Sequence, residues 1–206
     1  MYLPVAFRVD DEAQVRDFVA DRGSATLVTV GPDGQPDASL LPVLWEDDLV
    51  VAHLARANDH WRRIATGGAA DGAPALLVVT GPEAYVSPSW YPSKAEHGRV
   101  VPTWNYSAVH LRGRVTVRDD AEWLRGVVTR LTDRHETGRE LPWAVGDAPE
   151  RYLERQLRAI VGVCLRVESV EAKAKWSQNR SDEDRAGVLA GLPDPAAQSR
   201  VRSGSL

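Results

Sequence analysis

The sequence predicts a mainly β protein in which helices flank and interrupt an antiparallel sheet. At least six segments have the alternating or continuous apolar pattern that is typical of strands. Their connections are either tight turns or segments with helix-capping residues at their ends. Short strands with helices inserted between them indicate a β-barrel with flanking helices.

The N-terminal half begins with a helix and continues as a meander of strands. Asp10 or Asp11 can cap the first helix, and Gly23 follows it in the position where glycine commonly ends a helix. A second, short helix starts at Asn58 or Asp59 and reaches Ile64. The strands expected in this half cover residues 24–30, 38–45, 49–54, 75–80 and 83–87. Residues 31–34 form the turn of a hairpin, and residues 88–98 are expected to be a loop.

The C-terminal half contains the longest strand pattern, over residues 101–118, in which Gly113 marks an expected bend or bulge. Helices are expected at 122–135 and 148–159, followed by a strand over 160–170 and a short helix that ends between Gly187 and Gly191. We therefore expect one domain over residues 1–191. The tail over 192–206 is expected to be disordered.

The composition excludes several classes of function. The net charge of −4 argues against a surface that binds nucleic acid directly, because such a surface needs clustered Lys and Arg. No segment has the roughly 18 consecutive apolar residues of a membrane span. Residues 1–11 lack the pattern of a signal peptide, and the single cysteine, Cys164, cannot form an internal disulfide. These features predict a cytoplasmic protein.

A first polar cluster lies where a strand ends and a helix begins. The N-terminus of a helix favours an anion, and Arg56 adds a planar donor suited to phosphate. The alternative is a capped surface helix without a ligand. The candidate residues of this cluster are His53, Arg56, Asn58, His60 and Trp61.

Two further clusters combine aromatic side chains with hydrogen-bond donors. Aromatic rings and an amide at the start of the long strand could stack on a flat polar ring system such as a flavin, or could simply pack at the mouth of a barrel. Donors that follow the last strand could face a ligand or only solvent. The candidates are Thr103, Trp104, Asn105, Tyr106, Lys175, Gln178 and Asn179.

Chemistry without a cofactor finds no support in the sequence. There is no Gly-rich nucleotide-binding motif, no Cys-x-x-Cys pair and no histidine spacing that predicts a metal site. No carboxylates form an obvious acid and base pair. If the protein catalyses a reaction, a bound cofactor is the remaining source of the chemistry.

The chain resembles the PaiB family of FMN-binding split barrels, which are labelled negative transcriptional regulators. The resemblance is carried by His53–Asn58 with His60 and Trp61, and by residues 81–91. It is also carried by Val101–Tyr106 and Ser177–Arg180. The sequence departs from the family pattern at Leu40, Asp59 and Trp176, where the family usually has His, Pro and Leu.

This resemblance implies a six-stranded antiparallel Greek-key split barrel that forms a homodimer in a bacterial cytoplasm, with FMN sites at the subunit interface. It implies that His53, Arg56 and Asn58 lie near the phosphate. Residues 104–106 and 178–179 would lie near the ring or the ribityl chain. Regulation without direct reading of DNA is the favoured function, and an FMN-dependent oxidoreductase with an unknown small substrate is the alternative. Haem binding, with His53, His60 or His110 as ligand, is a third.

Overall fold

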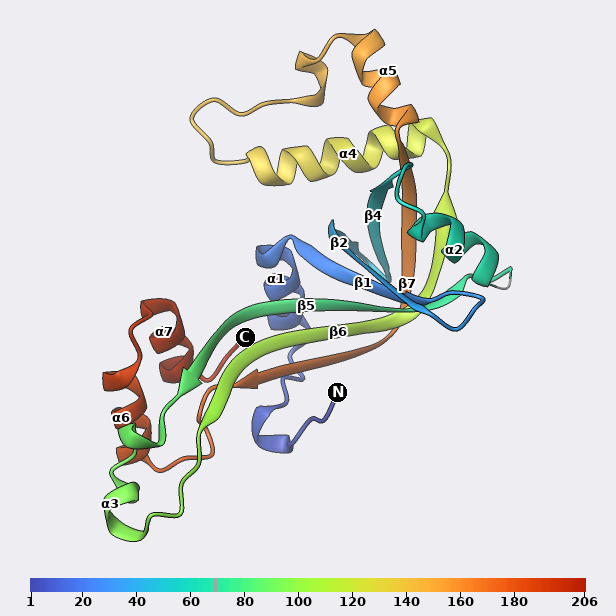
Figure 1. Ribbon diagram of the computed structural model, residues 1–206. Helices are drawn as coiled ribbons and strands as arrows, with labels where there is room; N and C mark the ends of the chain where they lie inside the picture. Colours follow the sequence, from blue (N-terminus) through green and yellow to red (C-terminus); the bar gives the residue numbers. More distant parts are fainter. Residues whose placement is uncertain (69) are drawn as a thin grey trace. The chain divides into compact units, whose positions relative to one another are not determined.

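The computed structural model describes residues 1–68 and 70–206, and the strands of this described part form one sheet (Figure 1). The strand order is β2-β1-β5-β6-β7-β4-β3. The strands are β1 (Ser24–Val30), β2 (Pro36–Pro42), β3 (Leu44–Glu46), β4 (Leu49–Ala55), β5 (Ala73–Val86), β6 (Thr103–Arg118) and β7 (Ile160–Lys175). The α-helices are α1 (Glu12–Arg22), α2 (His60–Gly67), α3 (Ser93–His97), α4 (Ala121–Glu136), α5 (Glu150–Arg158), α6 (Asp182–Gly191) and α7 (Pro195–Ser203). Short 3-10 helices are η1 (Val5–Phe7), η2 (Pro88–Trp90) and η3 (Val145–Asp147).

The expected antiparallel sheet with flanking helices is confirmed, but the described residues form seven strands rather than the six of the expected split barrel, and β2 and β3 remain open edges of the sheet. The predicted strand over 38–45 is two strands. β2 pairs antiparallel with β1 as far as Pro42, which lacks an N–H group to continue a ladder. Val43 then donates to the carbonyl of Gly23 at 3.0 Å, and β3 pairs with β4 instead.

The chain divides into two compact units, each assembled from segments far apart in the sequence. Unit 1 comprises residues 1–22, 79–110 and 171–206, and unit 2 comprises residues 23–78 and 111–170. The strands β5, β6 and β7 contribute residues to both units.

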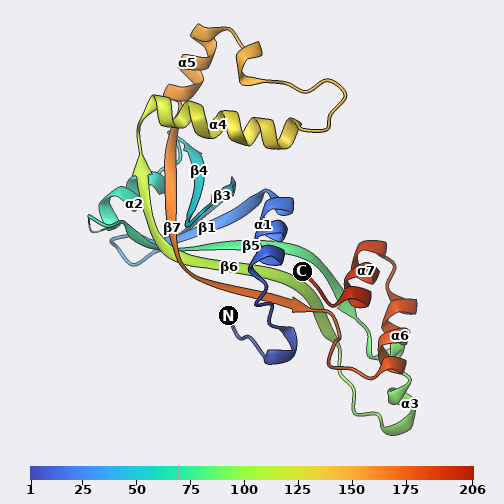
Figure 2. The ribbon, with the colours of Figure 1, turned by 180° about the vertical axis from the view of Figure 1, so that it is seen from behind.

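Unit 2 contains the hairpin of β1 and β2 and the neighbouring helices α4 and α5. Asp120 caps α4 by accepting a hydrogen bond from the backbone of Trp123 at 2.8 Å. α4 and α5 lie side by side in both ribbon views (Figures 1 and 2). One apolar cluster joins α4 to strand residues, and another joins it to α5. They contain Leu44, Val51, Val127, Leu131 and Cys164, and Leu124, Val145, Leu153 and Leu157, respectively.

Gly113 lies where β6 and β7 approach closely within unit 2. A Cβ atom at this position would lie 1.8 Å from the backbone oxygen of Arg166. The glycine is therefore required for the contact between the strands, a role related to the expected bend.

Unit 1 contains α1, α6 and α7 together with the C-terminal part of β5, the N-terminal part of β6 and the C-terminal end of β7. Trp176 is fully buried, and its indole nitrogen donates to Ser107 Oγ at 2.8 Å. The departure from the family pattern at Trp176 therefore lies in the core. No helix in residues 1–68 and 70–206 is long and apolar enough to cross a membrane.

The tail expected to be disordered, residues 192–206, instead contains α7. Asp194 caps this helix by accepting from the backbone of Ala196 at 2.9 Å, and Gly204 ends it with a φ of 68°. Val201 and Leu206 are buried, so apolar contacts hold the tail in unit 1. The loop expected over 88–98 likewise contains η2 and α3, and β5 continues through Gly81 and Pro82 without the expected break.

Candidate functional site

The predicted site residues form two groups, one in each unit. His53, Arg56, Asn58, His60 and Trp61 belong to unit 2. Thr103, Trp104, Asn105, Tyr106, Lys175, Gln178 and Asn179 belong to unit 1. The candidates are thus divided between the two units.

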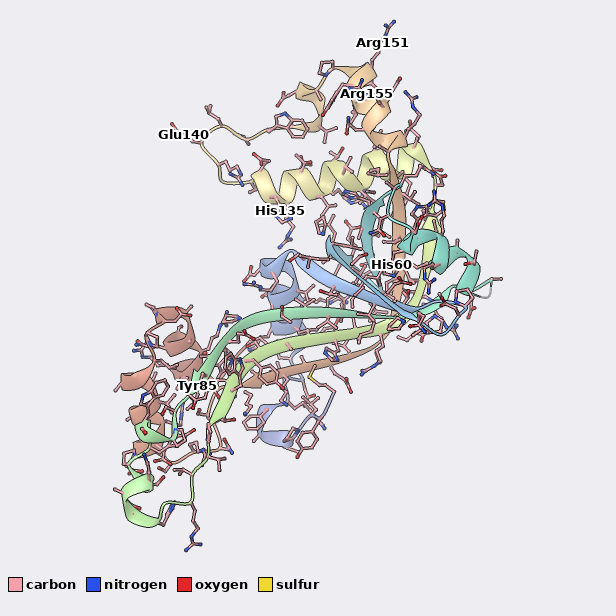
Figure 3. All side chains as sticks on the ribbon, in the orientation of Figure 1. His60, Tyr85, His135, Glu140, Arg151 and Arg155 are labelled. Atoms are coloured by element: carbon pink, nitrogen blue, oxygen red, sulfur yellow. The ribbon has the colours of Figure 1, made fainter. Side chains whose placement is uncertain are left out.

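His60 anchors the start of α2 in unit 2. Its ring nitrogens lie 2.9 Å from Thr29 Oγ1 and 2.9 Å from Ser39 Oγ, and the side chain is buried (Figure 3). Asn58 donates to Ser39 Oγ at 3.2 Å and accepts from the backbone N–H of His60 at 3.0 Å. Burial lowers the pKa of His60, which favours a neutral imidazole. His60 therefore holds α2 against the hairpin, and Asn58 presents its exposed amide beside it.

Arg56 is largely engaged inside unit 2. Its guanidinium binds both carboxylate oxygens of Asp119, with Nη1 at 3.0 Å from Oδ2. The same guanidinium donates to the carbonyls of Arg158 at 2.9 Å and Ile160 at 3.1 Å. The hydrogen bonds with Arg56 lower the pKa of Asp119. A phosphate at Arg56 would therefore compete with the carboxylate of Asp119.

Trp61 and His53 differ in their surroundings. The Trp61 indole nitrogen donates to the carbonyl of Arg56 at 2.9 Å, and the Arg62 guanidinium lies 4.8 Å from the ring centroid. His53 lines a cavity of about 290 Å³ whose wall includes Leu131 and Trp143. His53 Nδ1 is buried and has no hydrogen-bond partner within residues 1–68 and 70–206, and burial lowers the pKa of this histidine. The uncharged ring has an unused polar atom.

Lys175 provides a cation beside exposed aromatic rings in unit 1. Its ammonium donates to Thr103 Oγ1 and, at 2.8 Å, to the carbonyl of Trp104. Trp104 is 47% exposed, and its ring lies 6.1 Å from that of Tyr85 at an angle of 59°. Burial lowers the pKa of Lys175, and Lys173 and Arg180 lower it further. An ammonium has three N–H groups, so these two bonds leave one donor for a ligand.

Asn105 and Gln178 use their amides to build the turn that follows β7. Asn105 is fully buried and donates to Ser177 Oγ at 3.0 Å, while Ser177 has a φ of 66°. Gln178 accepts from the backbone of Trp176 at 2.7 Å and donates to the carbonyls of Ala174 and Gly204. These bonds fix the turn, and the next residue, Asn179, is exposed.

Tyr106 completes the unit 1 group. Its ring lies 5.1 Å from the Lys173 ammonium. Sequence reasoning did not include Tyr85 among the site residues, nor Ser39 and Asp119, which hold His60 and Arg56. Tyr85 could have been found from its place in an aromatic stretch before residue 91, whereas the other two are revealed only by tertiary contacts.

The donor set of unit 1 fits a flavin. A flavin ring is flat and polar at its edge, and it gains negative charge on reduction, so a cation near the ring tunes its chemistry. The exposed Trp104 ring can stack on such a surface, and Lys175 retains a donor. In unit 2 the accessible amide of Asn58 fits a phosphate, whereas Arg56 fits only if Asp119 is displaced.

Comparison with known proteins gives a consistent assignment. Residues 1–169 match the family model described as "Putative FMN-binding domain". The chain is 34% identical over 196 residues to protease synthase and sporulation protein PAI 2 of Bacillus subtilis, which covers 93% of this chain and 89% of that protein. An uncharacterized protein of Aspergillus fumigatus is 39% identical over 133 residues, which covers 57% of this chain and 51% of that protein. Relatives therefore occur outside bacteria, and the bacterial source stays a prediction.

A solved structure shares the fold. The FAD and heme binding protein from Mycobacterium smegmatis superposes with a TM-score of 0.59 at 24% identity, over 96% of this chain and 97% of that one. This likeness supports an antiparallel sheet with flanking helices.

Proposed function

We propose, from the membership of this chain in the PaiB family of FMN-binding proteins, that it binds FMN. The FMN-bound protein would have a regulatory role without binding DNA directly. The family's cofactor is a flavin. The Bacillus subtilis relative is named a protease synthase and sporulation protein, and the reference to sporulation supports a regulatory role. The net charge of −4 disfavours direct binding to DNA, so the regulatory role would be exerted through a partner protein or a metabolite.

The observation that carries the FMN proposal is the position of Lys175. Its ammonium is held on Thr103 and on the backbone of Trp104, next to an exposed indole. We assign Lys175 and Trp104 to the flavin ring, as donor and stacking surface. Asn58 and the start of α2 give unit 2 a separate place where an anion could bind.

A titration of the protein with FMN, followed by quenching of flavin fluorescence, tests this proposal. We expect Lys175→Met to weaken FMN binding at least about tenfold, because a charge-assisted hydrogen bond is lost. The matched control is Lys94→Met, since Lys94 is exposed and donates to Ser89 Oγ at 3.0 Å. It should bind like the unsubstituted protein. An unchanged dissociation constant for a folded Lys175→Met variant would remove Lys175 from the site.

An FMN-dependent oxidoreductase is the second candidate, and the same lysine favours it. Bound FMN would supply the redox chemistry, and Lys175 would place a fixed cation near its ring. The test is a visible absorption spectrum of the FMN-loaded protein before and after NADH or NADPH is added. Bleaching of the spectrum would support the oxidoreductase, and a flavin that stays oxidised with both donors would support the regulatory role.

A further inference from the structure

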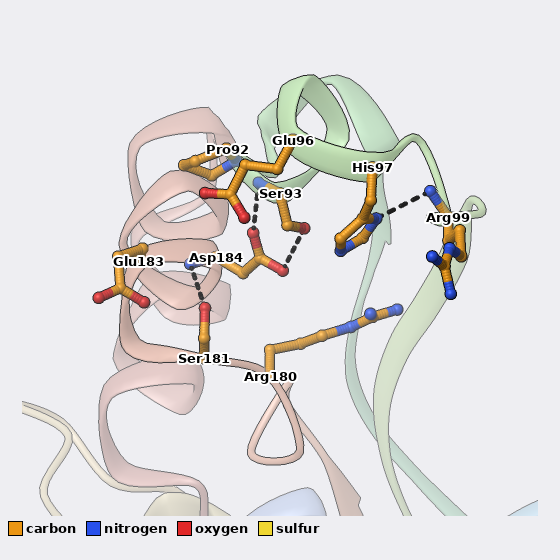
Figure 4. Close-up of a pocket in the computed structure, with 9 residues that line it drawn as sticks. All are labelled: Pro92, Ser93, Glu96, His97, Arg99, Arg180, Ser181, Glu183 and Asp184. Atoms are coloured by element: carbon orange, nitrogen blue, oxygen red, sulfur yellow. Dashed lines mark hydrogen bonds between the residues drawn. The ribbon is translucent and has the colours of Figure 1, made fainter.

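A cavity of about 750 Å³ lies in unit 1 between α3 and α6, apart from the residues assigned to FMN (Figure 4). We call it the α3–α6 pocket. Its volume falls within the range of about 300–1,000 Å³ that is usual for small-molecule sites. Neither Lys175 nor Trp104 lines it.

The walls of the α3–α6 pocket are held by one buried carboxylate. Asp184 is only 5% exposed and accepts from Ser93 twice, from the backbone at 3.2 Å and from Oγ at 2.8 Å. The backbone N–H of Asp184 donates to Ser181 Oγ at 3.2 Å (Figure 4). These bonds fix the start of α6 against α3, so the pocket does not have to be assembled when a ligand enters.

One side of the pocket presents hydrogen-bond donors. The Arg180 guanidinium lies 4.7 Å from the ring centroid of Tyr91, an arrangement that limits its movement. Neither Arg180 nor Arg99 forms an ion pair with a carboxylate in the described part of the chain. His97 Nδ1 accepts from the backbone of Arg99 at 3.0 Å, so a neutral His97 carries its proton on Nε2. Figure 4 shows Arg180 extending toward His97 and Arg99.

The pocket also contains carboxylates, and these decide which ligand it can hold. Glu96 and Glu183 line it together with Asp184. Three carboxylates outnumber the two guanidinium groups, so a dianion such as phosphate would be repelled. A ligand that carries one carboxylate and one ammonium group satisfies both sides.

We propose that the α3–α6 pocket binds a small molecule that carries one carboxylate and one ammonium group. The ligand carboxylate binds the planar donors of Arg180 and Arg99, and its ammonium group faces Glu96 and Glu183. Ser93 and Asp184 act as positioning residues for the walls. The assignment does not depend on FMN, because none of the residues that carry it is assigned to the flavin.

The probe is L-alanyl-L-alanine, and its binding is measured by isothermal titration calorimetry with the full chain. N-acetyl-alanyl-alanine lacks the ammonium group, and alanyl-alanine amide lacks the carboxylate. We expect saturable binding of the dipeptide and at least about tenfold weaker binding of either derivative, because each loses one charged contact. Absence of saturable binding, or equal binding of all three compounds, would overturn the proposal.

Substitutions then locate the binding. Arg99→Gln should weaken dipeptide binding by up to about tenfold, and by less than the amide derivative does, because Arg180 still binds the ligand carboxylate. Glu96→Gln should weaken binding of the dipeptide but not of the N-acetyl derivative. Arg202→Gln, on α7, is the control, because Arg202 is exposed and lies outside the pocket. Unchanged binding in both pocket variants would show that the dipeptide binds elsewhere. Neither variant disturbs the Tyr91 ring or Asp184, so their folding is a lesser risk than that of Arg180→Gln.

Discussion

At the scale of single residues, Arg56 joins three parts of unit 2. Its side chain bonds Asp119, just before α4, and the carbonyls of Arg158 and Ile160, where α5 gives way to β7. Both partners of the ion pair are partly exposed, so its contribution to the free energy of unfolding is about 0–1 kcal/mol. A phosphate bound at Arg56 would have to displace the Asp119 carboxylate, because both anions bind the planar guanidinium group through the same N–H donors.

This competition makes Asp119 the useful partner for a test of Arg56. We expect Arg56→Ala to weaken FMN binding at least about tenfold if the guanidinium reaches the phosphate. Asp119→Asn should then leave binding unchanged or strengthen it, because it removes the competing charge and retains a similar shape. Dissociation constants and thermal midpoints are measured for both variants. Lower midpoints with unchanged FMN binding would show that Arg56 serves only the structure.

The candidate site residues differ in how well the sequence alone predicts their contacts. The resemblance implies that residues 104–106 and 178–179 lie near one ligand, and the structure places the Lys175 ammonium 2.8 Å from the carbonyl of Trp104. Gln178 resembles a ligand-binding amide equally well, yet it bonds the carbonyl of Gly204, 26 positions away. No local pattern reports a contact at that separation, so the two roles of an amide cannot be told apart from the sequence.

At the scale of elements, two glycines allow α6 to pack against η2. A Cβ atom at Gly187 would lie 1.9 Å from the backbone oxygen of Trp90, and one at Gly191 would lie 2.3 Å from the Trp90 ring. The expected short helix ending at these glycines is present as α6, although the sequence gives no reason for two glycines within it. Both glycines are explained by this tertiary contact, because a side chain at Gly187 would meet the Trp90 backbone and one at Gly191 would meet the Trp90 ring.

Gly187→Ala should lower the free energy of unfolding by about 1–3 kcal/mol, the usual cost of inserting a methyl group into a closely packed contact. The matched control is Gly126→Ala in α4, where a Cβ atom would meet only the end of the flexible Arg130 side chain at 3.2 Å. Alanine there should raise the stability by about 0.5–1 kcal/mol through its helix propensity. Urea unfolding curves give both values. Equal effects of the two substitutions would contradict the close contact.

Other elements differ from expectation for reasons that lie in the sequence. α7 has an Asp cap, a proline at its first position and a glycine beyond its end, which together form a complete helix signal. The small and polar residues nearby make the same segment resemble a disordered tail. The division of residues 38–45 into β2 and β3 is harder to foresee, because Pro42 shows where a ladder ends but not which strand the chain joins next.

At the scale of the whole molecule, the open sheet has two edge strands in the described residues, and β2 is the longer. Unpaired edges with exposed apolar side chains are sites where another chain can bind. Leu40, on β2, is 73% exposed, and Val30, on the neighbouring β1, is 57% exposed. The departure from the family pattern at Leu40 therefore adds apolar surface at an edge. This surface is compatible with the homodimer that the family resemblance implies.

We expect multi-angle light scattering at micromolar concentration to give the mass of a dimer. Leu40→Lys should shift the protein toward the monomer, because two copies of a new charge would be desolvated or repel each other in a symmetric interface. Leu141→Lys is the control, since Leu141 is 89% exposed but lies in the loop between α4 and η3. If both variants remain dimers, β2 is not the interface, and another exposed apolar surface must hold the copies together. If the unsubstituted protein is itself a monomer, FMN binding has to be explained by one chain alone, and the expected homodimer is wrong.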